Sequence, residues 1–195
     1  MRRILAPLAA VVVLALAVPS HAGSFSYADP ADMPANGGLD ILSVTYATTG
    51  KGKGKAYVPS TLVATMTLSA TPVEQPGVGY EIAGAVDGCG EFTFSYTPGT
   101  VASAVIGEAL LTVGCGGTTP VSEGQILTPK FEVTGSTLTW SIGLKALPKE
   151  TRAGSVLTSL VSRVDFVEPG FGSRPVQPAP GVFDTATTDK SWKIS

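Results

Sequence analysis

Short segments in which apolar and polar residues alternate, separated by glycine and proline, constrain the fold of this chain most strongly. In the segment 62–70 the apolar residues Leu62, Ala64, Met66 and Leu68 fall on one face, and mostly threonine and serine fall on the other. An alternation with a period of two residues is typical of a β-strand that has one face in a core and the other in water. Proline and glycine at 72, 76 and 77 then end the strand.

Further segments of this kind predict most of the remaining structure. The 23 glycines and 15 prolines supply turns between them. The segments 23–38 and 169–180 have loop composition. The segment 101–113 favours a strand but is also compatible with a short helix, and 156–167 forms either two strands or one bent strand. The expected strands are 39–46, 62–70, 80–86, 92–96, 101–113, 131–133, 137–144, 156–160, 161–167 and 189–194.

Some eight to ten short strands joined by turns predict an all-β fold. The expected architecture is a two-sheet antiparallel β-sandwich, jelly-roll-like in its connections. No stretch of helical periodicity is long enough to supply crossover helices, which disfavours a parallel α/β fold. Because neither an internal repeat nor a composition break is visible, residues 23–195 are expected to form a single domain.

Residues 1–22 predict a secretory signal peptide that is cleaved. Arg2 and Arg3 precede an apolar stretch at 4–18, and the small residues Ser20 and Ala22 suit signal peptidase. Cleavage is therefore expected after Ala22, and the protein is expected to be secreted and extracellular. No later apolar run is long enough to span a bilayer, so no transmembrane segment is expected.

The predicted cleavage removes the one histidine, His21. Without imidazole, the mature protein lacks the commonest general base and the middle member of most nucleophilic triads. Two carboxylates could still hydrolyse a glycosidic bond. However, Glu81, Glu91 and Glu132 fall on polar faces of expected strands, where acids are ordinarily solvated. The sequence therefore predicts a protein that is not an enzyme, with a histidine-free carboxylate hydrolase as the enzymatic alternative.

Charge excludes one class of partner. The predicted cleavage removes two of the 13 Lys and Arg residues and none of the 15 Asp and Glu residues, which leaves 11 against 15 and a formal net charge of −4. A mildly acidic protein with scattered charge lacks the basic patch that nucleic-acid binding requires. No nucleic-acid partner is expected.

The two cysteines, Cys89 and Cys115, predict a disulfide bond. An even pair in a secreted chain most simply forms a bridge. In the chain-entropy description such a bridge stabilises the fold by roughly 3–4 kcal/mol. A metal or redox pair is the alternative, but the C-x-x-C spacing is missing and no histidine or third cysteine assists.

Oxygen-bearing side chains cluster near both ends of the mature chain. Hard cations such as calcium take six to eight oxygen ligands, including backbone carbonyls, and the ends of a β-sandwich often lie together. No cofactor is required, but a structural calcium is a candidate; the alternative is that these residues simply form turns. The candidate ligands are Asp29, Asp32, Asn36 and Asp40 near one end and Asp184 and Asp189 near the other.

Aromatic residues offer a further candidate site, because secreted sandwiches that bind sugars usually present an exposed ring. Trp140 is in register with Leu138 and Ile142, which predicts a core position, and the aromatic residues at 92, 94 and 96 are expected in the core for the same reason. Trp192 and Tyr57 have no such pattern. Each is a candidate for an exposed, ligand-binding ring, with burial as the alternative.

An acidic loop followed by Leu39-Asp40-Ile41, together with the strand at 137–140 and the late segment 184–189, resembles a group of secreted bacterial β-sandwiches. These are the family-9-type carbohydrate-binding modules and the DOMON-like domains. The resemblance implies a non-enzymatic sandwich tied by calcium, with a sugar or haem as ligand in some members. A haem would have to do without an axial imidazole here, leaving only Met33 or Met66.

These observations together predict a secreted, non-catalytic binding module. An extracellular carbohydrate or a cell-envelope polymer is the first ligand class to expect. A surface structural or protein-interaction role is the alternative.

Overall fold

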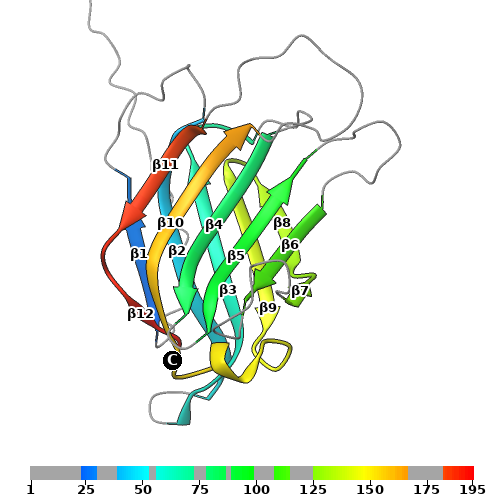
Figure 1. Cartoon of the computed structure of the whole chain (residues 1–195), viewed down its shortest axis with the longest axis vertical. Coiled ribbons are helices and arrows are strands. Elements are labelled where there is room, and N and C mark those ends of the chain that lie inside the picture. The colour runs from blue at the N-terminus through cyan, green and yellow to red at the C-terminus, as the bar shows by residue number, and fades with distance from the viewer. Residues whose placement is uncertain are drawn as a thin grey trace, which may run out of the picture.

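The computed structural model describes residues 23–29, 39–52, 56–72, 78–86, 89–98, 108–114, 125–166 and 182–195. These residues form two antiparallel β-sheets that pack face to face, which confirms the predicted β-sandwich (Figure 1). The predicted signal peptide lies outside the described residues, so cleavage and secretion stay predictions. Among the described residues no helix is long and apolar enough to cross a membrane.

The first sheet, called sheet A, has the strand order β1-β2-β3-β9-β8. Strands β3 and β9 are neighbours in the sheet although they are distant in sequence. Sheet A is therefore complete only when the β8–β9 hairpin pairs with β3. Its strands are β1 (Ser24–Ala28), β2 (Ile41–Lys51), β3 (Val58–Leu68), β8 (Lys130–Thr134) and β9 (Thr137–Gly143).

The second sheet, called sheet B, has the strand order β11-β10-β4-β5-β6-β7, and β12 also pairs with β10. A 3₁₀ turn, η3 (Lys149–Thr151), lies between β9 and β10. The strands are β4 (Val78–Val86), β5 (Gly90–Thr97), β6 (Glu108–Val113), β7 (Gln125–Leu127), β10 (Val156–Phe166), β11 (Val182–Thr188) and β12 (Trp192–Lys193).

Aromatic side chains join the two sheets in the core. Trp140 of β9 is fully buried and its Nε1 donates to the carbonyl oxygen of Ser95 on β5, 3.1 Å away. The rings of Tyr96 and Phe131 stack at 4.1 Å between centroids, again from opposite sheets. The core position of Trp140 is thereby confirmed, as are those predicted for Phe92, Phe94 and Tyr96, which are buried on sheet B.

Glycine residues allow two local irregularities in the sheets, the tight turn between β8 and β9 and a bulge in β10. Gly135 has a φ of 58° in the two-residue turn between β8 and β9, a conformation that glycine adopts without strain. In β10 the register shifts between Thr158 and Val161, and Ser159 has a φ of 51° there. Gly84 makes room for this bulge, because a Cβ at that position would lie 2.7 Å from Leu160.

Several boundaries differ from the sequence expectations. The loop predicted at 23–38 contains strand β1. The loop predicted at 169–180 lies outside the described residues, and β11 forms at 182–188, where no strand was expected. Strand β7 was also missed. The segment 156–167 forms one bent strand rather than two. The part of 101–113 that is described, 108–113, is a strand.

Candidate metal centre

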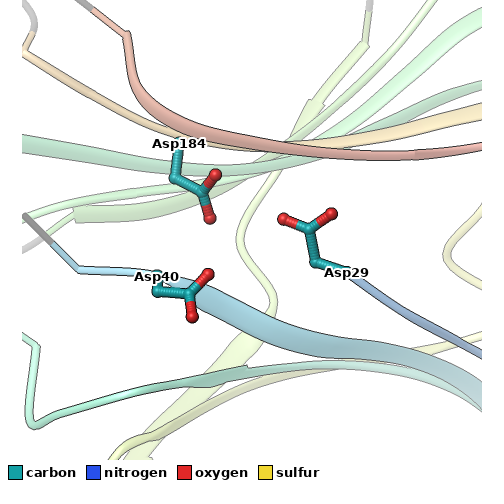
Figure 2. A group of neighbouring side chains, drawn as sticks. All are labelled: Asp29, Asp40 and Asp184. Carbon is teal, nitrogen blue, oxygen red and sulfur yellow. The ribbon is translucent and has the colours of Figure 1, made fainter. Parts of the chain in front are cut away.

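Three aspartates meet where the edge of sheet A faces the edge of sheet B. Asp29 directly follows β1, Asp40 directly precedes β2, and Asp184 lies in β11 (Figure 2). One carboxylate oxygen of each residue lies within 4.8 Å of an oxygen of the other two. We call Asp29, Asp40 and Asp184 the acidic triad.

Backbone hydrogen bonds fix the acidic triad in place. The Oδ2 atom of Asp184 accepts from the backbone N–H of Ile41 at 2.6 Å, which ties β11 to the start of β2. Its Oδ1 atom accepts from the N–H of Thr185 at 2.8 Å. The backbone of Asp40 exchanges hydrogen bonds with Ser69, donating to its Oγ at 3.1 Å and accepting from its N–H at 2.8 Å.

Burial gives the acidic triad its chemical character. Asp184 is only 8 % exposed, because its side chain points inward from β11 in line with Ala186. Asp29 is half-buried, and its Oδ2 atom has no contact with solvent; the same holds for Oδ1 of Asp40. Like charges this close repel one another. A hard cation between the three carboxylates would offset that repulsion, and oxygen ligands of this kind are those calcium prefers.

The sequence predicted six residues for this centre, and the structure brings three of them together. Asp32 and Asn36 lie outside the described residues. Asp189 is exposed just beyond the end of β11, and it is not one of the residues that gather.

A pair of tyrosines extends the polar surroundings into the core. The Oη atom of Tyr27 lies 2.7 Å from Oγ of Ser162, a hydrogen bond that joins β1 to β10. Burial, aided by the negative charge of Asp29, raises the pKa of Tyr27 to about 12. Tyr46 of β2 is fully buried, and burial also raises its pKa. The sequence pattern did not predict a role for either tyrosine hydroxyl, because a tyrosine in a strand is equally well explained as a core residue.

The two aromatic candidates for ligand binding have different surroundings. For Trp192 the alternative of burial holds: it is 6 % exposed, and its ring stacks on Tyr46 with centroids 6.0 Å apart. Its indole face is therefore covered by the core rather than presented to a ligand. Tyr57 is half-buried, and its hydroxyl donates to the carbonyl oxygen of Thr48 at 2.9 Å.

The predicted disulfide can be followed from one side only. Cys89 is buried in the turn before β5. Cys115 lies outside the described residues, so the bridge stays a prediction. Gly114, which precedes Cys115 in the sequence, donates its N–H to the carbonyl oxygen of Glu91 at 2.8 Å. This hydrogen bond brings the end of β6 beside the residues that follow Cys89.

The outward side of sheet A is lined with hydroxyl groups. On β2, β3 and β9 the outward residues alternate with core residues and align in rows, such as Thr45, Thr65 and Thr139. The Ser and Thr residues among them are half-buried, and the apolar residues Ala47 and Val63 lie in one row with Ser141. At the edge of the sheet, Lys130 and Glu132 of β8 lie next to Ser141 and Thr139. We call this surface the hydroxyl face; it consists of Ser43, Thr45, Thr49, Thr61, Thr65, Thr67, Thr137, Thr139 and Ser141.

Comparison of the chain with protein-family models, with curated proteins and with solved structures finds no match. The resemblance to family-9-type carbohydrate-binding modules and DOMON-like domains therefore stays a prediction.

Proposed function

We propose that this protein is a secreted, non-catalytic binding module whose β-sandwich is fastened by a calcium ion held in the acidic triad. The observation that carries the proposal is the approach of three carboxylates, from three separate segments and both sheets, to within 4.8 Å of one another. Oxygen-only ligands from short Asp-containing segments suit a hard cation. The burial of Asp184 supports a structural rather than a catalytic role, because it leaves little room for a substrate.

Calcium in this position would act on the whole sandwich. Asp29 and Asp40 lie at the ends of strands in sheet A, and Asp184 lies in a strand of sheet B. One ion would therefore bridge the two sheets where their edges face each other. A ligand that binds only the folded state stabilises it by about 2.7 kcal/mol at a concentration 100 times its Kd. For a domain of this size such a gain raises Tm by roughly 5–10 °C.

A calcium titration with matched variants tests this proposal. Isothermal calorimetry and thermal melts compare the unaltered protein with Asp184→Asn and Asp189→Asn. Asparagine keeps the shape of aspartate but loses its charge, so Asp184→Asn is expected to abolish the rise in Tm on adding calcium. Asp189 is exposed and outside the acidic triad, so Asp189→Asn is expected to keep it. A Tm that calcium and chelator leave unchanged, or that shifts equally in all three proteins, contradicts the proposal.

For the ligand we propose an uncharged extracellular carbohydrate or envelope polymer, bound on the hydroxyl face. The support is chemical: aligned, uncharged Ser and Thr side chains offer donors and acceptors to a partner that carries hydroxyl groups itself. The protein is acidic, so it repels an acidic polymer more strongly than an uncharged polymer.

A glycan array, followed by a pull-down on insoluble polysaccharides, tests the ligand class. Thr65→Lys places a charge at the centre of the hydroxyl face and is expected to abolish binding. Thr93→Lys places the same charge on the outer side of sheet B and is the matched control. No glycan binding by a protein that still binds calcium would favour a protein partner instead.

A further inference from the structure

We propose that the edge of β8 that faces away from β9, to which no described strand is paired, pairs with the same edge of a second copy of this chain. The two copies would join in antiparallel orientation about Phe131, forming a twofold dimer in which sheet A continues from one copy into the other. This inference is independent of the calcium and carbohydrate proposals. It rests on the position of β8 in the sheet, on the direction of its backbone groups and on its charges.

Strand β8 is the last strand of sheet A, and its only strand partner among the described residues is β9. The turn at Gly135 and Ser136 is flanked by the pair Thr134 and Thr137. In a two-residue hairpin this flanking pair is hydrogen-bonded, and hydrogen-bonded pairs then alternate along the ladder. Glu132 and Lys130 therefore direct their backbone groups toward β9, whereas Val133 and Phe131 direct theirs toward the edge that faces away from β9.

The charges on β8 are complementary to themselves. Lys130 and Glu132 form an ion pair at 2.6 Å, and their side chains are 73 % and 58 % exposed. In an antiparallel pair centred on Phe131, Lys130 of each copy lies opposite Glu132 of the other. Both are then non-hydrogen-bonded pairs, in which Cα atoms approach to about 4.5 Å and side chains are closest. Two new ion pairs would form across the interface.

The same charges oppose the neighbouring arrangement. Pairing centred on Glu132 would set Glu132 opposite Glu132 and leave both lysines without an acid across from them. Charged residues on an edge strand usually prevent pairing with other chains. Here their alternation permits one register and penalises the next, which gives specificity as well as attraction.

The backbone and the apolar residues of β8 agree with this register. Phe131 would exchange two hydrogen bonds with Phe131 of the second copy, and Val133 would donate to the carbonyl oxygen of Pro129, which needs no N–H for that role. Val133 is 43 % exposed, and so is available for burial in the dimer.

Sedimentation equilibrium of Lys130→Glu, Glu132→Lys and a mixture of the two tests the proposal. Each single variant places like charges opposite one another, and the dimer dissociation constant is expected to rise on the order of ten-fold. In the mixture, one copy carries two acids and the other two lysines, so a heterodimer regains both cross-interface pairs. Dimerisation is expected to return in the mixture, although neither variant alone has regained its intrachain ion pair.

Val58→Asp, which adds a charge at an exposed apolar position on another strand, is the matched control and is expected to leave dimerisation unchanged. A protein that stays monomeric up to millimolar concentration overturns the proposal. So does a dimer whose dissociation constant is the same in all variants, or one that the mixture does not restore. Thermal melts of each variant separate loss of folding from loss of pairing.

Discussion

Two buried tyrosines of sheet A, Tyr27 and Tyr46, differ in what their hydroxyl groups do. The hydroxyl of Tyr27 shares a hydrogen bond with Ser162, which is itself fully buried. The hydroxyl of Tyr46 is buried too, and it has no hydrogen-bond partner among the described residues. A buried polar group that loses its partner costs folding free energy, whereas removing one that had no partner costs little.

Phenylalanine substitutions should therefore have different effects at these two positions. Tyr27→Phe leaves the Ser162 hydroxyl buried and unpaired, and is expected to lower the free energy of unfolding by about 1–3 kcal/mol. Tyr46→Phe is expected to leave it unchanged or to raise it. Urea denaturation measures both values. A loss in Tyr46→Phe equal to that in Tyr27→Phe would show that the Tyr46 hydroxyl has a partner, such as a buried water.

Residue type and spacing placed the three aspartates of the acidic triad among the candidates, but could not separate them from the other candidates. Asp29, Asp40 and Asp184 were all among the six candidates. Asp184 joins the acidic triad because its position in the alternation of β11 turns its side chain inward, and Asp189 does not join it because it lies past the end of the strand. Which face of the strand Asp184 occupies could not be predicted, because β11 itself was not predicted. The same holds for Trp192, whose burial depends on the pairing of β12 with β10.

At the scale of the strand, Glu81 and Arg163 form a cross-strand pair on the outer side of sheet B. Desolvation raises the pKa of Glu81 above its ordinary value of 4.5, and the charge of Arg163 only partly opposes this. The folded state therefore holds the Glu81 proton at pH values where the unfolded chain has lost it. Stability from this group increases as pH falls toward 4.5, and it is lost as pH rises through the raised pKa.

Glu81→Gln should accordingly flatten the dependence of stability on pH. The variant is expected to gain stability at pH 7 relative to the unaltered protein and to lose that advantage near pH 4.5. Denaturant unfolding at a series of pH values measures the difference. Asp189→Asn, which changes an exposed acid, serves as the control. An unchanged slope between pH 7 and 4.5 in Glu81→Gln would contradict this account.

Central strands were predictable from sequence, whereas the edge strands β1, β7 and β11 were not; the edge strand β8 was predicted together with its hairpin partner β9. Strands β3, β5 and β9 have one fully apolar face, because neighbours on both sides and the opposite sheet cover them. Strands β1, β7 and β11 lie at sheet edges and are shorter or richer in Ser, Thr and Asp. An edge strand buries less area, so its sequence carries less alternation for a pattern to reveal.

At the scale of the whole molecule, the predicted bridge between Cys89 and Cys115 would staple the ends of β5 and β6. Thiol titration of the unfolded, unreduced protein is expected to find no free thiol. Replacing both cysteines with serine is expected to lower the free energy of unfolding by roughly 3–4 kcal/mol. Two reactive thiols, or a double variant as stable as the unaltered protein, would contradict the bridge.

The three residues of the acidic triad come from the first and last parts of the chain, so they can meet only after the whole chain has been made. The hydrogen bond from Ile41 to Asp184 spans 143 residues, so the first and last parts of the fold must meet before the centre exists. Contacts this distant form late and slowly. A truncated or stalled polypeptide offers at most two of the three carboxylates. Capture of the ion would thus distinguish finished molecules from incomplete ones.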